Sequence, residues 1–217
     1  KSRNLMTIRM AQEIGMRKIT DYAKRFNINR TMPRVLAMAL GAGETSLMRL
    51  TTAYAMLVNG GKRVEPIFID RVQDRYGKTL FRKDERDCIG CNVEMFDAQV
   101  APDLPDAREQ VLSPQTAYQV VSMLEGAVTR GTGRRISTIG KPLAGKTGTT
   151  NDSRDAWFVG FSADLVAGVY VGYDDNRPLG KGESGGRVAA PIFKEFMEQA
   201  LTDMAPPPFR VPPRVNL

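Results

Sequence analysis

The sequence of 217 residues contains no histidine, so proton transfer near neutral pH must use lysine, serine, tyrosine or carboxylate side chains. Lys146 stands in the most specific pattern available to such chemistry. The run Gly140-Lys141-Pro142-Leu143-Ala144-Gly145-Lys146-Thr147 literally matches G-x-x-x-x-G-K-[ST], the pattern of a phosphate-binding loop. Taken alone, this match predicts nucleotide binding.

The sequence around this match does not fit a phosphate-binding loop. Such a loop needs a strand before it and a helix after it, so that N–H groups at the helix N-terminus face the phosphates. Residues 131–135 make a poor buried strand, and residues 148–152 make a poor helix start. Asp174 is a weak candidate for the carboxylate that such proteins use with Mg²⁺. Nucleotide binding is therefore the weaker alternative.

The same lysine also opens the tetrapeptide Lys146-Thr147-Gly148-Thr149. On a strand, Lys146 and Gly148 would point to one face, and Thr147 and Thr149 to the other. The lysine would place a charge near a nucleophile, and Gly148 would let another element pack closely behind the strand. The threonine hydroxyls and the backbone could bind a substrate carboxylate and an oxyanion. An exposed polar strand edge without a ligand is the simpler alternative.

Several stretches, taken in order, extend this pattern into a resemblance. Ser2-Arg3-Asn4 matches S-x-N, although by itself it is more readily explained as a Ser or Asn helix cap. The sequence then continues with residues 40–46, 130–133, 144–150 and 155–161. Together these stretches resemble the transpeptidase domain of class A, bifunctional penicillin-binding proteins, whose motifs include S-x-N and K-T-G. The resemblance covers most of the chain except residues 83–110.

The resemblance implies a reaction in which a serine of S-x-x-K attacks the D-Ala-D-Ala carbonyl of a peptidoglycan stem peptide. The acyl group then passes to a neighbouring amine, and β-lactams acylate the same serine. Ser2 would relay a proton, Asn4 would bind the peptide amide of the substrate, and Lys146 would support the proton path. Thr147 and Thr149 would hold the terminal carboxylate, and the N–H of Thr149 would form half of the oxyanion hole.

The nucleophile itself is absent, because no serine in the chain has a lysine three positions later. In the family S-x-x-K precedes S-x-N, so the resemblance implies an upstream segment of the same protein that carries the serine. This chain alone is then expected to be inactive. A non-catalytic envelope-binding module is the other alternative, and a serine β-lactamase fits the insert and the tail less well. The resemblance implies no cofactor and no metal.

The expected fold class is α/β, penicillin-binding/serine β-lactamase-like, with an antiparallel sheet flanked by helices and incomplete at its N-terminal side. Apolar periodicity predicts helices over 5–26 (interrupted at Gly15), 45–59, 113–128 and 190–201, and hairpins over 67–81 and 157–173. We expect the transpeptidase part to span 1–203, with residues 83–110 as a surface insert. The proline-rich residues 204–217 are expected to leave the domain as a tail.

The charge distribution and the two cysteines indicate which partners and which cellular compartment to expect. The net charge of +7 is interleaved with acidic residues, which argues against nucleic-acid binding. Cys88 and Cys91 favour a structural disulfide, with half a zinc site and a redox pair as alternatives. The expected location is the cell envelope, on the periplasmic side of the cytoplasmic membrane, with the membrane anchor of the parent protein outside this chain. The expected partners are peptidoglycan stem peptides and β-lactams.

Overall fold

The computed structural model describes residues 2–86, 88, 90, 91, 95, 100, 102 and 104–215. The chain forms two compact units. The larger unit comprises Lys1–Val64 and Gln110–Leu217, and the smaller unit comprises Glu65–Glu109. The smaller unit therefore begins before the predicted insert, because the hairpin that precedes the insert belongs to it.

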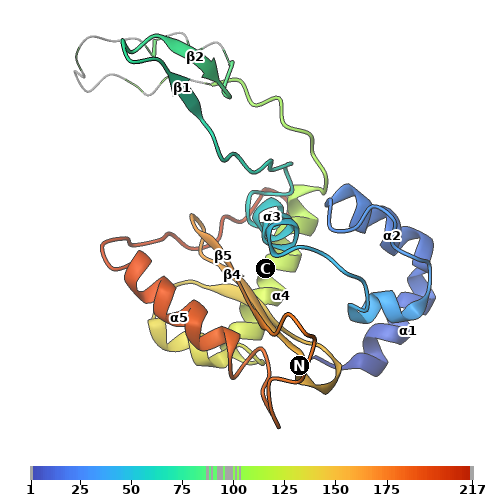
Figure 1. The fold of residues 1–217 in the computed structure, drawn as a ribbon. Coiled ribbons are helices and arrows are strands. Elements are labelled where there is room, and N and C mark those ends of the chain that lie inside the picture. Colours follow the sequence, from blue (N-terminus) through green and yellow to red (C-terminus); the bar gives the residue numbers. More distant parts are fainter. Residues whose placement is uncertain are drawn as a thin grey trace. The chain divides into compact units, whose positions relative to one another are not determined.

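The first two helices of the larger unit are α1 (Asn4–Ile14) and α2 (Met16–Arg25), coloured blue in Figure 1. They are separated by Gly15, whose φ of 88° lies in the region that only glycine adopts readily. The predicted interruption at Gly15 is thus confirmed. A short 3₁₀ turn, η1 (Leu36–Leu40), contacts both helices.

Two further helices begin at serine caps. In α3 (Leu47–Val58) the Ser46 hydroxyl accepts a hydrogen bond from the N–H of Arg49. In α4 (Pro114–Thr129) Ser113 accepts from the N–H of Thr116. Each bond satisfies one of the free N–H groups at a helix start, and proline at the first position has no N–H to satisfy.

The sheet of the larger unit has three antiparallel strands in the order β3 (Ala144–Thr149), β4 (Asp155–Phe161) and β5 (Val166–Gly172). In the register, Lys146 lies opposite Val159 and Gly148 lies opposite Trp157. A helix, α5 (Ala189–Ala200), follows the sheet and contacts β4 and β5, while α3 and α4 contact the sheet as well (Figure 1). This is the predicted antiparallel sheet flanked by helices.

Alternation along β4 sends its side chains into two separate apolar clusters. Phe158 packs on Phe193 of α5, with ring centroids 4.7 Å apart. Phe161 packs on Tyr54 of α3, with centroids 6.2 Å apart, and shares its cluster with Val121 of α4. The sheet is therefore fixed between helices on both faces, which holds β3 rigidly in place.

The proline-rich end of the chain does not leave the domain as we expected. Phe209 lies edge-on to Phe161 with ring centroids 5.6 Å apart, and the Gln115 side chain donates to the carbonyl of Pro213 at 3.1 Å. Proline prevents helix and ladder formation but not packing, and one aromatic side chain is enough to attach an extended segment to a core.

In the smaller unit a two-stranded hairpin pairs β1 (Arg71–Gln73) with β2 (Thr79–Arg82). Its turn is closed by Asp74, whose carboxylate accepts from the N–H groups of Tyr76 and Lys78 at 2.9 Å each. The predicted hairpin is confirmed, although residues 67–69 precede the strand instead of belonging to it.

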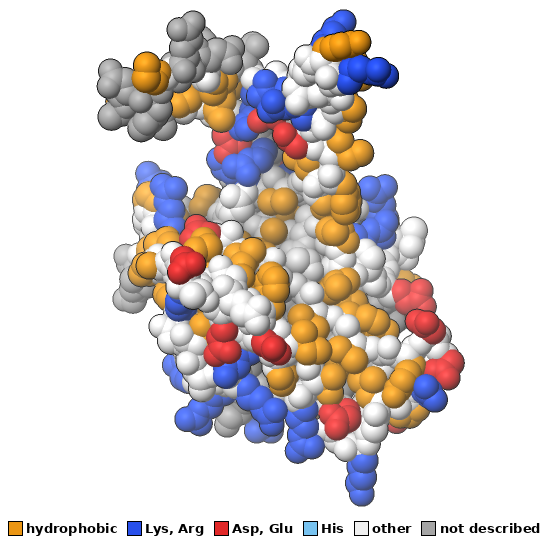
Figure 2. All heavy atoms as spheres, turned by 60° about the vertical axis from the view of Figure 1, so that its left-hand side comes forward, with side chains coloured by type: hydrophobic (Ala, Val, Ile, Leu, Met, Phe, Trp, Pro, Cys, Tyr) orange, Lys and Arg blue, Asp and Glu red, His pale blue; other side chains and the backbone are white. Residues whose placement is uncertain are grey.

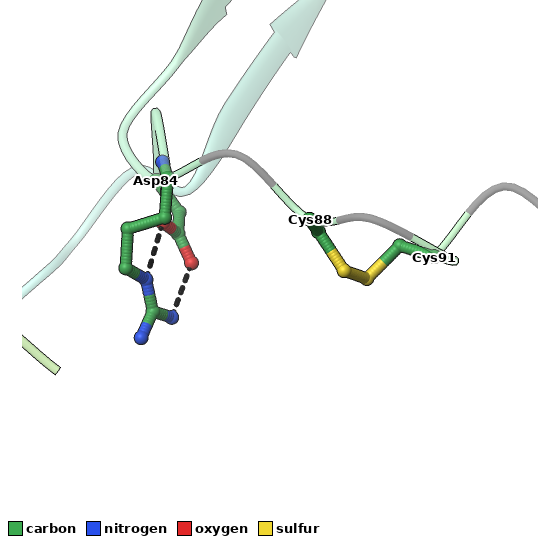
Figure 3. The surroundings of a disulfide bond; sticks show 4 residues. Asp84, Cys88 and Cys91 are labelled. Atoms are coloured by element: carbon green, nitrogen blue, oxygen red, sulfur yellow. Dashed lines mark hydrogen bonds and ion pairs between the residues drawn. A yellow bond between two sulfur atoms is a disulfide. The ribbon is translucent and has the colours of Figure 1, made fainter. Parts of the chain in front are cut away.

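A disulfide joins Cys88 and Cys91 in the same unit (Figure 3). This outcome matches the favoured prediction for the C-x-x-C motif. Close by in sequence, Arg86 forms a bidentate ion pair with Asp84, at 2.6 and 2.8 Å, and holds the pKa of that carboxyl well below its usual range.

Basic side chains are spread over the face drawn in Figure 2, with acidic side chains among them. This distribution agrees with the interleaved charges of the sequence. No helix in the described ranges is both long and apolar enough to cross a bilayer.

Candidate functional site

A polar cleft of about 470 Å³ lies in the larger unit, at β3 and the start of α1. Four of the six site residues predicted from the two motifs line it: Ser2, Asn4, Thr147 and Thr149. The full lining comprises Ser2, Asn4, Thr132, Arg135, Thr147, Thr149, Ser184, Gly186 and Arg187. The cleft thus brings residues from the beginning, middle and end of the chain to one place.

The two motifs meet through a direct contact between side chains. Lys146 Nζ donates to Ser2 Oγ at 3.2 Å. The alternative in which Ser2 or Asn4 caps the helix does not hold, because the cap position of α1 is Arg3 and no side chain caps its N–H groups. Ser2 is therefore directed to the cleft, and Asn4 stands beside it as the first residue of α1.

Lys146 is half-buried, and its ammonium donates hydrogen bonds to other groups of the protein. Besides Ser2, it donates to the carbonyl of Thr147 at 2.8 Å and more weakly to Thr147 Oγ1 at 3.4 Å. Burial lowers its pKa below the ordinary value of 10.5, because the charged form loses solvation. A lysine with a lowered pKa next to a serine hydroxyl can accept and return a proton more readily than an exposed lysine.

The hydroxyls of Thr147 and Thr149 are each held by a partner from another segment. Thr147 Oγ1 lies 2.8 Å from Thr132 Oγ1. Thr149 Oγ1 accepts a hydrogen bond from the N–H of Gly185 at 3.0 Å. Both threonines line the cleft, and Lys146 reaches the cleft rim, because its ammonium donates to Ser2.

Gly185 is buried against the backbone of the strand pair that carries the motif. A Cβ at this position would lie 2.3 Å from the carbonyl oxygens of Gly148 and Trp157, well inside van der Waals contact. Only glycine fits here, so the segment before α5 can approach β3 closely enough to donate to Thr149. Gly148 has the companion role, since a Cβ there would press on the Cβ of Trp157 at 3.1 Å.

The cleft is electropositive. Arg135 and Arg187 line it, Lys146 lies at its rim, and no Asp or Glu belongs to its lining among the described residues. Arginine guanidinium groups together with hydroxyl donors suit a ligand that carries a carboxylate or another planar anion.

The local structure around Lys146 is wrong for a phosphate-binding loop. Lys146 lies in the middle of a strand, and the next element is η3 (Asn151–Ser153), a single 3₁₀ turn rather than an α-helix. Lys141, within the same pattern, is bound elsewhere and donates to the carbonyls of Leu201 and Met204. In the continuous described segment 104–215, the pattern therefore has no helix N-terminus to face phosphates.

Five residues of the cleft were not assigned a role from the sequence: Thr132, Arg135, Ser184, Gly186 and Arg187. Thr132 belongs to Arg130-Gly131-Thr132-Gly133, a stretch that carried the resemblance without a chemical role. Ser184-Gly185-Gly186-Arg187 had one visible signal, a glycine pair beside a hydroxyl and a cation. Sequence spacing cannot show that these two segments converge, because packing across the sheet edge brings them together.

The described residues hold no group of three or more His, Cys, Asp or Glu side chains placed to bind an ion. The donor set of the cleft is cationic and hydroxylic, which is also unsuited to a hard cation.

Comparison with known proteins agrees with this geometry. The sequence model of the penicillin binding protein transpeptidase domain matches residues 1–198. The chain belongs to the penicillin-binding protein transpeptidase family.

Relatives of the transpeptidase domain are similar along its whole length. The chain is 46% identical to penicillin-binding protein 1A of Rickettsia conorii over 219 residues, which cover 100% of this chain and 28% of that protein. It is 34% identical to penicillin-binding protein 1A of Pseudomonas aeruginosa, covering 100% of this chain and 31% of that one. The chain therefore spans less than a third of the length of these curated relatives.

A solved structure gives the same result for the fold. The crystal structure of penicillin-binding protein 1A from Haemophilus influenzae superposes with a TM-score of 0.84 at 34% identity, covering 99% of this chain and 35% of that chain.

Proposed function

We propose that this chain forms the S-x-N and K-T-G side of the active site of a peptidoglycan D,D-transpeptidase. In this proposal a serine of an S-x-x-K sequence outside these 217 residues takes the acyl group of a stem peptide ending in D-Ala-D-Ala. D-Alanine leaves, and the acyl group passes to an amine of a neighbouring peptide. β-Lactams acylate the same serine.

The contact between Lys146 Nζ and Ser2 Oγ, at 3.2 Å, is the observation that carries this proposal. The reaction needs a group that moves a proton between the nucleophile and the leaving amine. A serine hydroxyl held by a lysine with a lowered pKa can do so without histidine, which the chain lacks. The pair stands at a cleft open to a ligand.

The remaining roles follow from what each group can donate. Thr147 and Thr149 present hydroxyls to the cleft and would hold the terminal carboxylate. Asn4 would bind the peptide amide of the substrate, because an amide side chain can both donate and accept. The N–H of Thr149 would supply half of the oxyanion hole, and the backbone of the nucleophile would supply the other half.

Location and partners follow from the proposed reaction. Its substrate is cell-wall peptidoglycan, so the site would work in the cell envelope, on the periplasmic side of the cytoplasmic membrane. The disulfide between Cys88 and Cys91 supports an oxidising compartment. Neither a cofactor nor nucleic acid enters the proposed reaction.

Covalent labelling tests the proposal. The natural protein in full length is incubated with benzylpenicillin and measured by intact-mass and peptide mass spectrometry. We expect one adduct per molecule, on the serine of an S-x-x-K sequence, and a strongly reduced rate in Lys146→Ala and Ser2→Ala. Lys181→Ala, at an exposed lysine that is not part of the cleft lining, is the matched control and should label normally.

Folded protein that forms no adduct with any β-lactam would overturn the transpeptidase assignment. The result would then favour a non-catalytic module with the same surface, which binding of peptidoglycan fragments without acylation would identify.

A further inference from the structure

Two hydroxyls of the cleft share one arrangement: each oxygen already accepts a hydrogen bond from another group of the protein. Ser2 Oγ accepts from Lys146, and Thr149 Oγ1 accepts from the N–H of Gly185. A serine or threonine hydroxyl has a single hydrogen. Because the ammonium form of Lys146 and the backbone N–H of Gly185 donate these bonds, the hydroxyl hydrogens of Ser2 and Thr149 remain available to a ligand.

For Thr147, the group to which its hydroxyl hydrogen is donated is not fixed by these contacts. Its oxygen accepts weakly from Lys146 at 3.4 Å and lies 2.8 Å from Thr132 Oγ1, where either oxygen can be the donor. If Thr147 donates to Thr132, its hydrogen is lost to the ligand. If Thr132 donates, the hydrogen of Thr147 points to the cleft, as those of Ser2 and Thr149 do.

A carboxylate ligand decides between the two arrangements. An ionised carboxylate only accepts hydrogen bonds, so a carboxylate at Thr147 requires the hydrogen of that residue. The short contact with Thr132 is kept only if Thr132 then supplies the hydrogen. We infer that Thr132 is a positioning residue, which donates to Thr147 and so directs the Thr147 hydroxyl at the carboxylate of the substrate. This inference rests on the proposed function.

The segment around Thr132 is built to hold this contact. Thr132 lies after α4, in the turn that leads to η2 (Arg134–Ile139), and both neighbours of Thr132 are glycines. Gly131 lies so close to Ala127 that a Cβ would meet its carbonyl oxygen at 2.7 Å, and the N–H of Gly133 donates to the same oxygen at 3.0 Å. The turn is thereby fixed to the end of α4, and its one hydroxyl faces β3.

The test uses the natural protein in full length and two ligands that differ only in the carboxylate: benzylpenicillin and its methyl ester. The second-order rate constant of acylation is measured for wild type, Thr132→Val and Thr132→Ser. Valine keeps the branched shape without the hydroxyl, and serine keeps the hydroxyl. Thr129→Val is the control, because it removes a hydroxyl that only returns to Glu125 within α4.

We expect Thr132→Val to lower acylation by benzylpenicillin about three- to tenfold, the usual range for one lost hydrogen bond. Acylation by the methyl ester should change less than about twofold on the same scale. Thr132→Ser and Thr129→Val should stay close to wild type with both ligands. The ratio of the two rate constants within one variant cancels any loss of folded protein, so partial unfolding cannot imitate the result.

An equal loss with both ligands, or no loss at all, would overturn the role of Thr132. If Thr132→Val does not fold, Thr132→Ala takes its place with the same expected ratio. Wild-type protein that neither ligand acylates would instead count against the proposed function, and a carboxylate effect present in wild type but unchanged by Thr132→Val would count against this inference alone.

Discussion

Lys146 Nζ lies within hydrogen-bond distance of Ser2 Oγ, at 3.2 Å, although 144 residues separate them in the chain. The two residues belong to different layers of the larger unit, since Ser2 precedes α1 and Lys146 lies in β3. Closing such a long segment costs conformational entropy, which the apolar clusters on both faces of the sheet must offset. The site therefore depends on the whole larger unit.

The half-buried ammonium of Lys146 predicts a pH dependence of stability. The pKa of Lys146 is lowered in the folded protein, so the unfolded chain binds more protons between that pKa and 10.5. Stability therefore rises with pH through this window, relative to a variant without the group, and the difference is constant below it. Unfolding in urea at several pH values, followed by fluorescence of the single tryptophan, Trp157, compares wild type with Lys146→Met.

Other titrating groups cancel when the two curves are subtracted. Lys181→Met is the matched control for the loss of an exposed lysine. If the stability of Lys146→Met and that of Lys181→Met rise equally with pH, the burial of Lys146 is not the cause of the rise. Trp157 is suited to this measurement because it lies in β4, next to the strand that carries Lys146.

The close approach of Gly185 to β3 predicts a severe effect of one methyl group. In Gly185→Ala the new Cβ would lie 2.3 Å from two backbone oxygens, so the segment must move away from the strand. We expect a loss of about 2 to 3 kcal/mol in stability and slower acylation by benzylpenicillin, since the N–H of Gly185 no longer reaches Thr149. Urea unfolding and acylation rates measure the two effects.

A glycine-to-alanine substitution in α4 should instead increase stability. In Gly126→Ala the new Cβ meets only the end of the Arg130 side chain, at 3.1 Å, and that side chain can turn away. Alanine is favoured over glycine within a helix by about 0.8 to 1 kcal/mol. If Gly126→Ala were destabilised as much as Gly185→Ala, the close approach of Gly185 to β3 would not explain the loss of stability in Gly185→Ala.

Periodicity predicted the helices and the hairpins well because each is fixed by its own residues: Gly15 breaks the first helix, and Ser113 caps α4. The K-T-G and S-x-N residues could be proposed for the site because the motifs are local, and four of them line the cleft. Thr132 and Arg187 could not be placed, since only tertiary packing brings their segments to β3. The tail was predicted wrongly for the same reason, as proline content reveals nothing about where Phe209 packs.

The contact of Phe209 predicts that the tail contributes to stability. Replacing a buried phenylalanine by alanine costs about 3 to 5 kcal/mol, and Phe209 is only partly buried, so we expect about 1 to 3 kcal/mol for Phe209→Ala. Val211→Ala, at a residue 43% exposed, is the control and should cost less than about 0.5 kcal/mol. Equal urea unfolding curves for wild type and Phe209→Ala would instead support the prediction that the tail leaves the domain.

The electropositive cleft predicts a salt-dependent rate with anionic ligands. Arg187 lines the cleft, and none of the described lining residues is acidic. A cleft of one charge sign raises the association rate of an opposite charge by about tenfold or more at low ionic strength. In the full-length protein, Arg187→Ala should therefore slow acylation by benzylpenicillin roughly tenfold at about 0.01 M salt, and much less at about 1 M, where charges are screened within about 3 Å.

Arg177→Ala is the control, because Arg177 pairs with Asp175 at 3.4 Å and lies outside the cleft lining. A loss in Arg187→Ala that stays the same at both salt concentrations would show that this arginine acts by local contact and not through its charge.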